Sequence, residues 1–369
     1  MTTTRPPKLS MVGPLPPAWG GVAVHLLRLQ EDLKSRFGLD VTVWNESKEP
    51  YPTPRHDVRR VVNYPSFCLA LLFRRERFWH LHTVSRLLLS LLPFYRLLGK
   101  RFMLTCHGEF LNGRLQKRDW ASRRLREGLA SCEAIVCVGE HIREQLEENG
   151  LPAGKLVVIH SFLPPDPGRK PRLPGEVQAF LDQAPGPVLA SNGSLRLLDG
   201  RDMYGIDQMV EMLPRLRVEG PAPRLLIYLY DAPNSPHERP ERLLQLLERA
   251  RELGVADRIL FHKSRNEEFW PVLEHSRVFL RATLSEGFGI SVLEAFAAGV
   301  PVVANAAAPR QAGCMLYPDR DIDRFARCVE SALEMGEEER AGLRRHPMLQ
   351  VDTAAALVAQ YRALGFISA

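Results

Sequence analysis

The chain has 369 residues, of which 45% are hydrophobic and 25% are charged. This length predicts two domains, and this composition excludes whole-chain disorder, a collagen-like repeat and a coiled coil. A chain of this size buries enough apolar surface to need no disulfide or structural metal. The net charge of +6 is unevenly spread: residues 1–165 carry 24 Lys and Arg against 15 Asp and Glu, whereas the remainder carries 25 against 28.

The cysteines and the apolar segments indicate a compartment. Six scattered cysteines form no CxxC pair, which is typical of reduced thiols in a cytosolic protein. The first 17 residues lack the apolar core of a secretion signal. The longest uncharged apolar stretches, 63–73 and 295–309, are shorter than the roughly 20 residues that span a bilayer. We therefore expect a cytoplasmic protein that lies, at most, peripherally on the inner face of a membrane.

The first half of the chain alternates short apolar runs with helical patterns, separated at 13–21 by a glycine- and proline-rich loop. Such alternation predicts a parallel sheet with helices on both faces. The expected strands are 9–12, 40–44, 78–82, 102–107, 134–138 and 155–160, and the expected helices are 22–37, 85–98, 120–129 and 140–148.

A proline-rich connector at 163–168 coincides with the change in charge, and a second alternation follows it. Its expected strands are 188–192, 224–230, 259–262, 278–281 and 300–304. Its expected helices are 206–216, 238–253, 267–275, 290–298 and 322–335. We predict two doubly wound, Rossmann-like α/β domains that face a central cleft. Residues 1–165 form the first domain, residues 166–350 the second, and residues 351–369 a C-terminal helix that packs back toward the first domain.

The segment 278–304 has the strongest functional pattern. A strand ends near Arg281, a tight loop with two glycines follows, and a helix begins near Ile290. Glycines before a helix let the backbone approach a ligand, and the free N–H groups of the helix N-terminus suit a diphosphate. Glu286 in the loop and Glu294 in the helix are suited to bind hydroxyls on either side of that anion, such as those of a sugar and a ribose.

The segment EGFGISVLEAFAAGVPVVA resembles the Glu-x7-Glu segment of the family 4 retaining glycosyltransferases, which have the GT-B fold. The resemblance extends over most of the chain. GPLPPAWGGVAVHLLRL resembles the N-terminal glycine loop and first helix of the family. FWHLH and MLTCHGEF resemble the strand ends that carry its histidines, and PRQAGCMLYPDRDIDRFARCVESAL resembles its closing donor-domain segment.

The resemblance implies roles for particular residues. Glu286 is expected to face the donor sugar, Glu294 the ribose, and His107 the transferred sugar. The donor diphosphate is expected to meet the backbone of Gly287, Phe288, Gly289 and Ile290 in one domain, and of Gly20 and Gly21 in the other. Plain structural roles stay open for several of these residues, including a capping acid for Glu286, a structural histidine for His107 and a simple turn for the paired glycines.

One departure from the family concerns positive charge. The family has a Gly-Arg…Lys-Gly pattern after the first donor-domain strand, whereas here Ser194 follows Gly193 and Tyr204 precedes Gly205. The leaving diphosphate needs charge stabilisation. Arg196, Arg201 and Arg281 are candidate replacements. We favour Arg196 over Arg201, which lies between Gly200 and Asp202 and fits a surface turn. Arg281 is the other favoured candidate, with a pairing to an acid at the strand end as its alternative.

The resemblance also implies a co-substrate and no cofactor. The donor is expected to be a nucleotide-diphosphate sugar, transferred with retention and without a metal. His80 and His82 share a strand face, but the sequence indicates no third ligand beside them, so no metal site is expected.

The expected partners are the donor and a glycan or lipid-linked acceptor in polysaccharide or glycolipid biosynthesis. The segment 73–78 and the helix near 85–100 combine Arg with Leu and Phe, which suits an anionic membrane surface, although the leucines also fit a core face. No basic patch interleaved with aromatic residues indicates nucleic acid. The alternatives to a transferase are a degenerate, non-catalytic GT-B partner subunit and a GT-B sugar-nucleotide epimerase.

Overall fold

The computed structural model describes residues 9–17, 20–48, 51–52, 55–117, 119–166, 168, 171–183, 185–230, 239–264 and 267–368. The chain divides into two compact units, which are Met1–Leu163 with Asp352–Ala369, and Pro164–Val351. This division falls between Leu163 and Pro164, and it assigns the C-terminal segment to the first unit.

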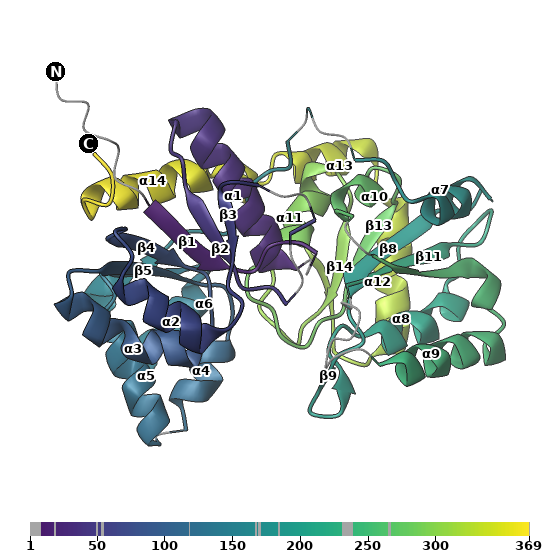
Figure 1. Cartoon of the computed structure of the whole chain (residues 1–369). Helices are drawn as coiled ribbons and strands as arrows, with labels where there is room; N and C mark the ends of the chain where they lie inside the picture. The colour runs from purple at the N-terminus through teal and green to yellow at the C-terminus, as the bar shows by residue number, and fades with distance from the viewer. Residues whose placement is uncertain are drawn as a thin grey trace. The chain divides into compact units, whose positions relative to one another are not determined.

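The first unit is built on a seven-stranded, wholly parallel sheet with the order β3-β2-β1-β4-β5-β6-β7 (Figure 1). Its strands are β1 Leu9–Gly13, β2 Thr42–Asn45, β3 Val58–Arg60, β4 Phe78–Leu81, β5 Arg101–Cys106, β6 Ala134–Cys137 and β7 Leu156–Val158. The central strands are buried on both faces, which is why they read as continuous apolar runs.

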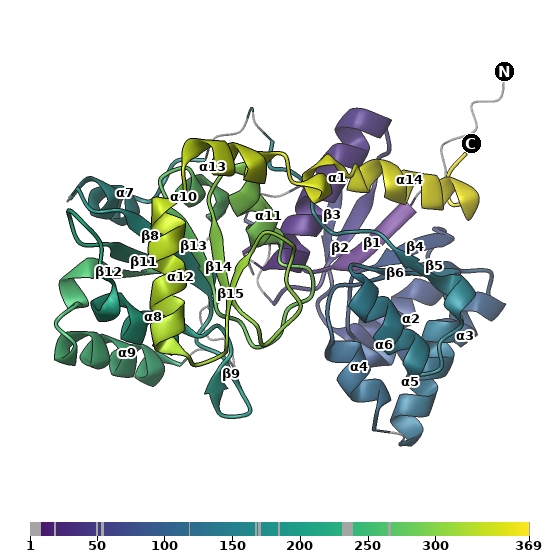
Figure 2. The ribbon, with the colours of Figure 1, turned by 180° about the vertical axis from the view of Figure 1, so that it is seen from behind.

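Helices cover both faces of this sheet. They are α1 Gly21–Phe37, α2 Tyr64–Leu72, α3 Arg86–Leu97, α4 Phe110–Leu115, α5 Trp120–Ala130, α6 Glu140–Glu148 and α14 Thr353–Ala363. Helices α1 and α14 lie side by side on one face, where Leu26, Leu29, Leu357 and Tyr361 join one buried core with the strands (Figures 1 and 2). On the other face, the α2 ring of Phe67 packs between strand tryptophans.

The second unit has a six-stranded parallel sheet with the order β12-β11-β8-β13-β14-β15. Its strands are β8 Val188–Gly193, β11 Arg224–Leu229, β12 Ile259–Lys263, β13 Val278–Arg281, β14 Val302–Asn305 and β15 Met315–Tyr317, and β9 Leu197–Leu198 and β10 Arg201–Asp202 form a separate hairpin. Its helices are α7 Gly175–Asp182, α8 Ile206–Met212, α9 Pro240–Glu252, α10 Trp270–Leu273, α11 Ile290–Ala297, α12 Ile322–Glu334 and α13 Glu337–Arg344.

The predicted α/β class and the parallel sheets are confirmed, with local differences. The predicted helix over 267–275 is a single turn, and the one over 206–216 ends early in a 3-10 turn because Pro214 cannot continue it. Strand β3 and helix α2 were not predicted. Two of the three β3 residues are exposed arginines, and α2 begins with Asn63 as its N-cap and Pro65 in its first turn.

Among the described residues, no helix is long and apolar enough to cross a membrane.

Candidate functional site

In each sheet, the residues predicted to act lie at the carboxyl ends of the strands. In parallel α/β sheets this edge is where ligands bind. In the second unit, Gly193 ends β8, Arg281 ends β13 and the Glu286 loop follows. In the first unit, the segment after β4 contains His82 and the segment after β5 contains His107.

Glu286 lies between two arginines. Arg281 Nε donates to Glu286 Oε2 at 2.7 Å, and one of its terminal nitrogens donates to Oε1 at 3.1 Å. Arg310 Nη1 lies 3.4 Å from the same Oε2 and donates to Thr283 Oγ1 at 2.8 Å. The side chains of Arg281, Glu286 and Arg310 are 11%, 9% and 2% exposed. These three side chains together carry a net positive charge, because two guanidinium groups meet one carboxylate.

The ion pair controls the ionisation of Glu286. Burial by itself would raise the pKa of the carboxyl group, but the attraction and hydrogen bonds of Arg281, aided by Arg310, hold that pKa below its usual value. Burial would likewise lower the pKa of Arg281, and Glu286 reverses this shift. Glu286 is therefore a carboxylate at neutral pH, and its two oxygens are already largely engaged.

Arg310 is a site residue that the sequence analysis missed. It follows β14, and it binds the Thr283 carbonyl at 2.6 Å and the Asn305 carbonyl at 3.0 Å in addition to Glu286. Its neighbour Gln311 donates to the carbonyl of Phe288 in the glycine loop. The available signal was the position of Pro309-Arg310-Gln311 directly after a strand of the same sheet.

The glycine loop leads directly into α11. Gly289 caps the helix with a left-handed backbone, φ +70°, which L side chains rarely adopt, and Gln311 lies 3.3 Å from the point that a Cβ would occupy. Phe288 and Ile290 are buried, Gly287 is half-buried, and the first turn of α11 contains no acid. Its free N–H groups therefore meet no competing carboxylate from that turn.

Glu294 and its neighbours extend this arrangement. Glu294 is 8% exposed, and its negative charge contributes, after burial, to raising the pKa of Tyr230 well above its usual value. Asn192 connects the groups, because Arg281 donates to its Oδ1 at 2.9 Å and Ser291 Oγ lies 3.4 Å from the same atom.

The other predicted cations differ in their surroundings. Arg196 is exposed in the segment between β8 and β9. Arg201 forms an ion pair with Asp319. Arg281, which we favoured as a phosphate ligand, uses its guanidinium on Glu286 and Asn192.

The paired glycines of the first unit begin α1. Gly20 is the N-cap residue and Gly21 the first helical residue, and both are exposed. No atom of the described residues lies within 4 Å of a Cβ built on Gly20, and the first turn contains no acid. This helix N-terminus therefore has open space for an anion.

His107 belongs to a chain of histidines. His82 Nδ1 lies 2.9 Å from His107 Nε2, and His82 Nε2 lies 3.3 Å from His80 Nδ1. His80 also contacts the hydroxyl of Tyr361 on α14 at 2.7 Å. His25 from α1 packs edge-on against His107. Burial holds the pKa of His80, His82 and His107 well below the usual value and lowers that of His25 to about 4.

A second polar cluster that was not predicted follows β2. The Thr83 hydroxyl donates to Glu46 Oε2 at 2.6 Å, and the Tyr64 hydroxyl also binds that oxygen. Burial raises the pKa of Glu46 to about 7, although the Thr83 hydrogen bond opposes this shift. The residues come from distant segments, so no local motif marked them.

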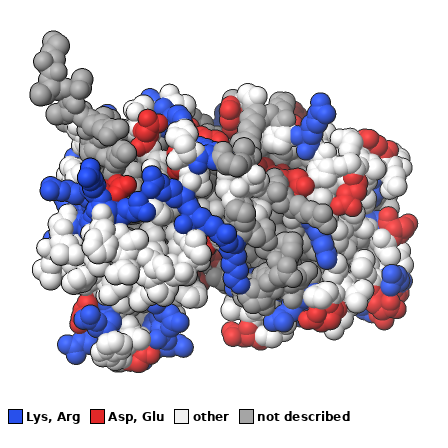
Figure 3. Space-filling view, in the orientation of Figure 1, with Lys and Arg blue, Asp and Glu red and all other residues white. Residues whose placement is uncertain are grey.

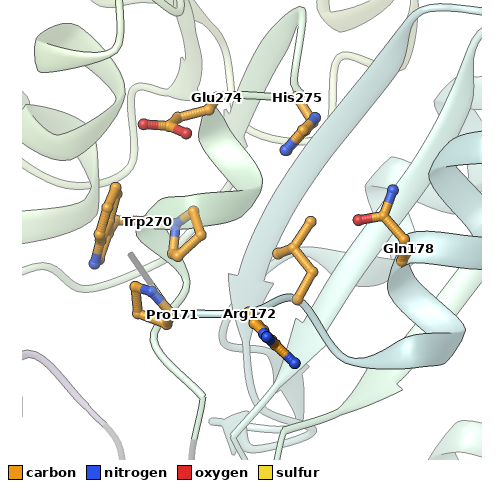
Figure 4. A pocket seen from close by; sticks show the side chains of 8 residues that line it. Pro171, Arg172, Gln178, Trp270, Glu274 and His275 are labelled. Atoms are coloured by element: carbon orange, nitrogen blue, oxygen red, sulfur yellow. The ribbon is translucent and has the colours of Figure 1, made fainter. Parts of the chain in front are cut away.

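A pocket of about 430 Å³ lies elsewhere in the second unit, and no predicted site residue lines it. Figure 4 shows Trp270 and Glu274 of the α10 segment facing Arg172 and Gln178.

Comparison with known proteins agrees with this arrangement. The profile of Glycosyltransferase Family 4 matches residues 19–166, and that of Glycosyl transferases group 1 matches residues 195–335. Together the two profiles span well over half of the chain. Both profiles describe glycosyltransferases, so the chain is a glycosyltransferase of the family 4 type.

Two curated relatives are similar in sequence. The D-inositol 3-phosphate glycosyltransferase of Geodermatophilus obscurus is 32% identical over 152 residues, which are 38% of this chain and 33% of that protein. The phosphatidylinositol N-acetylglucosaminyltransferase gpi3 subunit of Schizosaccharomyces pombe is 24% identical over 344 residues, which are 86% of this chain and 69% of that protein. The matched region thus spans about a third of the first relative and about two thirds of the second.

Solved structures share the fold. A sucrose-phosphate synthase from Thermosynechococcus elongatus has a TM-score of 0.72 at 17% identity, with 97% of this chain and 99% of that chain covered. The Anabaena protein HepE, solved with UDP and glucose, has a TM-score of 0.69 at 13% identity, with the same coverage. These similarities establish the GT-B fold.

Proposed function

We propose that the protein transfers a sugar, with retention and without a metal, from a nucleotide-diphosphate sugar to a glycan or lipid-linked acceptor. The family supports the transferase class, and the Anabaena relative in fold has been solved with UDP-glucose. The alternatives of a degenerate partner subunit and an epimerase are not favoured.

The observation that supports donor binding most directly is the buried Arg281–Glu286–Arg310 network beside the N-terminus of α11. Its net positive charge and the free N–H groups of the glycine loop suit a diphosphate. In this proposal Arg310 compensates for the basic pair that the family has and this sequence lacks. Glu294 binds the ribose, and His107 contacts the transferred sugar.

In this proposal the protein promotes sugar transfer by positioning the donor and acceptor and by stabilising charge on the leaving diphosphate. No side chain then has to transfer a proton to or from the sugar. The neutral state of the buried histidines agrees with this role, since His107 then acts through hydrogen bonds. In the second unit, exposed Arg196 is a further contact for the diphosphate.

The test is a screen of UDP-, GDP- and ADP-sugars for hydrolysis, with the anomer of the first product identified by NMR. We expect one nucleotide class to be hydrolysed, with retention. In Glu286→Gln and Glu294→Ala, loss of charge-assisted hydrogen bonds of about 1.5–3 kcal/mol each lowers the rate by roughly 10- to 150-fold. Glu211→Gln, which changes a half-buried acid that pairs with Arg249, is the control. Full activity in both site variants would refute the proposed donor site.

We also propose that the first unit rests on an anionic membrane. Leu69, Phe73, Phe94 and Leu97 on α2, α3 and the adjoining loop are exposed, while the interior-facing Leu88, Leu89 and Leu92 are buried. The exposed arginines near them are Arg75, Arg77, Arg86 and Arg96. Figure 3 shows an uncharged surface on this unit with Lys and Arg side chains gathered along its border. Apolar and basic side chains together suit a lipid interface.

A further inference from the structure

Three imidazoles of the first unit converge from three separate elements. His25 lies on α1, His82 follows β4 and His107 follows β5, and one ring nitrogen of each lies within 4.8 Å of the others. The expectation that His80 and His82 have no third potential ligand nearby was wrong. Helix α1 brings His25 to the strand ends from far away in the sequence, and β5 adds His107.

One ring nitrogen of His25 has no hydrogen-bond partner among the described residues. Its Nδ1 lies 2.8 Å from the carbonyl oxygen of Ser161, so Nδ1 carries the proton and donates. Its Nε2 is buried and has no hydrogen-bond partner among the described residues, and His25 is 2% exposed. A buried nitrogen without a partner is costly, and a backbone carbonyl that orients the other nitrogen is a common support of metal-binding histidines.

His82 has a similar support. In the tautomer in which His82 Nε2 donates to His80 Nδ1, at 3.3 Å, its Nδ1 keeps a lone pair. That nitrogen faces His107 Nε2 at 2.9 Å. The hydrogen bond between them holds one proton, and an ion between the two rings would replace that proton.

We propose that His25, His82 and His107 form a binding site for Zn²⁺, which holds His107 away from the donor sugar when it is bound. Three neutral imidazoles with an open fourth position are a common zinc ligand set, with Zn–N distances of about 2.0–2.1 Å. Tetrahedral geometry then sets the nitrogens about 3.3 Å apart, so small side-chain shifts suffice. On binding, the proton of the His82–His107 hydrogen bond moves from His107 Nε2 to His107 Nδ1, so that all three ligands stay neutral.

The burial of the three ligands shows from which side the ion can enter the site. His25 and His82 are buried, whereas His107 is half-buried, so the ion enters and the fourth ligand binds on the side of His107. Under the proposed function, His107 is the residue beside the transferred sugar. The metal and the donor therefore compete for the same imidazole, and this competition rests on the proposed function.

To test the site, the full chain is first freed of metal with a chelator. Zn²⁺ is then titrated into it in the presence of a second, chromophoric chelator that competes for the ion and reports how much the protein binds. We expect one ion per chain, and at least a ~100-fold loss of affinity in His25→Ala and in His107→Ala, where a direct ligand is removed. His56→Ala removes an exposed histidine of the same unit and is expected to leave the affinity unchanged. His25 is buried, so His25→Ala could fail to fold. His107 is half-buried, and the His107→Ala variant then tests the site by itself.

Two further measurements separate this site from others. With Co²⁺ as probe, imidazole ligands give visible bands without the thiolate charge-transfer band that binding to a cysteine such as Cys106 would produce. Unchanged Zn²⁺ affinity in both histidine variants, a thiolate band or no Zn²⁺ binding would overturn the site. Zn²⁺ binding that leaves donor hydrolysis unchanged would overturn the competition alone. A chain that hydrolyses no donor fails the proposed function, while the metal titration still decides the site.

Discussion

Gly193 and Tyr204 touch at the carboxyl end of β8, where a Cβ added to Gly193 would lie 2.6 Å from the tyrosine ring. The same ring lies under the guanidinium of Arg281, 5.6 Å from its centroid. Tyr204 stands in the position before Gly205 where the family has a basic residue. In this protein the ring fills the space beside the strand and supports an arginine instead.

We predict that Gly193→Ala lowers the free energy of unfolding by about 1–3 kcal/mol, because the tyrosine ring must move to admit the methyl group. Denaturant unfolding measures this. Gly175→Ala, at a position where nothing described lies within 4 Å of the added Cβ, is the matched control and is expected to be neutral or slightly stabilising. Equal effects of the two substitutions would show that the Gly193–Tyr204 contact is not restrictive.

We predict that Arg281→Ala destabilises the fold by about 3 kcal/mol, because it leaves the buried Glu286 carboxylate with a single ion-pair partner, Arg310 at 3.4 Å. In the double variant with Glu286→Gln, part of this loss is expected to return, since the unpaired charge is gone. Arg249→Ala breaks an exposed ion pair of the same unit and is expected to cost less than about 1 kcal/mol. Strict additivity in the double variant would contradict the coupling.

The pH dependence of stability is expected to reveal Glu46. Its pKa rises from 4.5 in the unfolded chain to about 7 in the fold, so the folded protein holds a proton that the unfolded chain has lost. The stability from Glu46 is fully present below about pH 4.5 and is lost as the pH rises through 7. The Tm of the wild type minus that of Glu46→Gln should therefore fall between about pH 5 and 8, because the buried histidines affect both proteins alike. Glu148→Gln, at an exposed helix position, should keep the wild-type slope.

Membrane binding is expected to depend on both charge and exposed apolar side chains. We predict that the full chain sediments with vesicles containing phosphatidylglycerol, less so at high salt, and less in Phe73→Asp or Leu97→Asp. Leu244→Asp alters an exposed leucine of the second unit and is the control. Equal partition onto neutral and anionic vesicles would exclude the electrostatic contribution.

Much of the fold was predictable because buried parallel strands are apolar along their whole length. Residues 102–106 and 134–137 have this character, and both are central strands. Edge strand β3 is not apolar along its length, because its two arginines are exposed to solvent. The glycine loop was predictable for a similar local reason: Gly289 must adopt a left-handed backbone to begin α11.

The side-chain partners were not predictable, because they are set by contacts between segments that are distant in the sequence. Arg310 reaches Glu286 across 24 residues, and His25 reaches the strand-end histidines from another layer of the fold. In the sequence, His25 looks like one more residue on the inward face of an amphipathic helix. Only the packing of α1 against the sheet separates it from its leucine neighbours.

The place of α14 in the first unit has a consequence for biosynthesis. Tyr361 closes the core over Leu26 and Leu29 and hydrogen-bonds to His80, yet the ribosome makes it about 200 residues after β7, which at 5–20 residues per second is tens of seconds or less. The second unit contains all of its own strands and can fold first. The N-terminal half therefore waits, with one face of its sheet incompletely covered, until the last helix emerges, and a chaperone that shields apolar surface would be needed most during that interval.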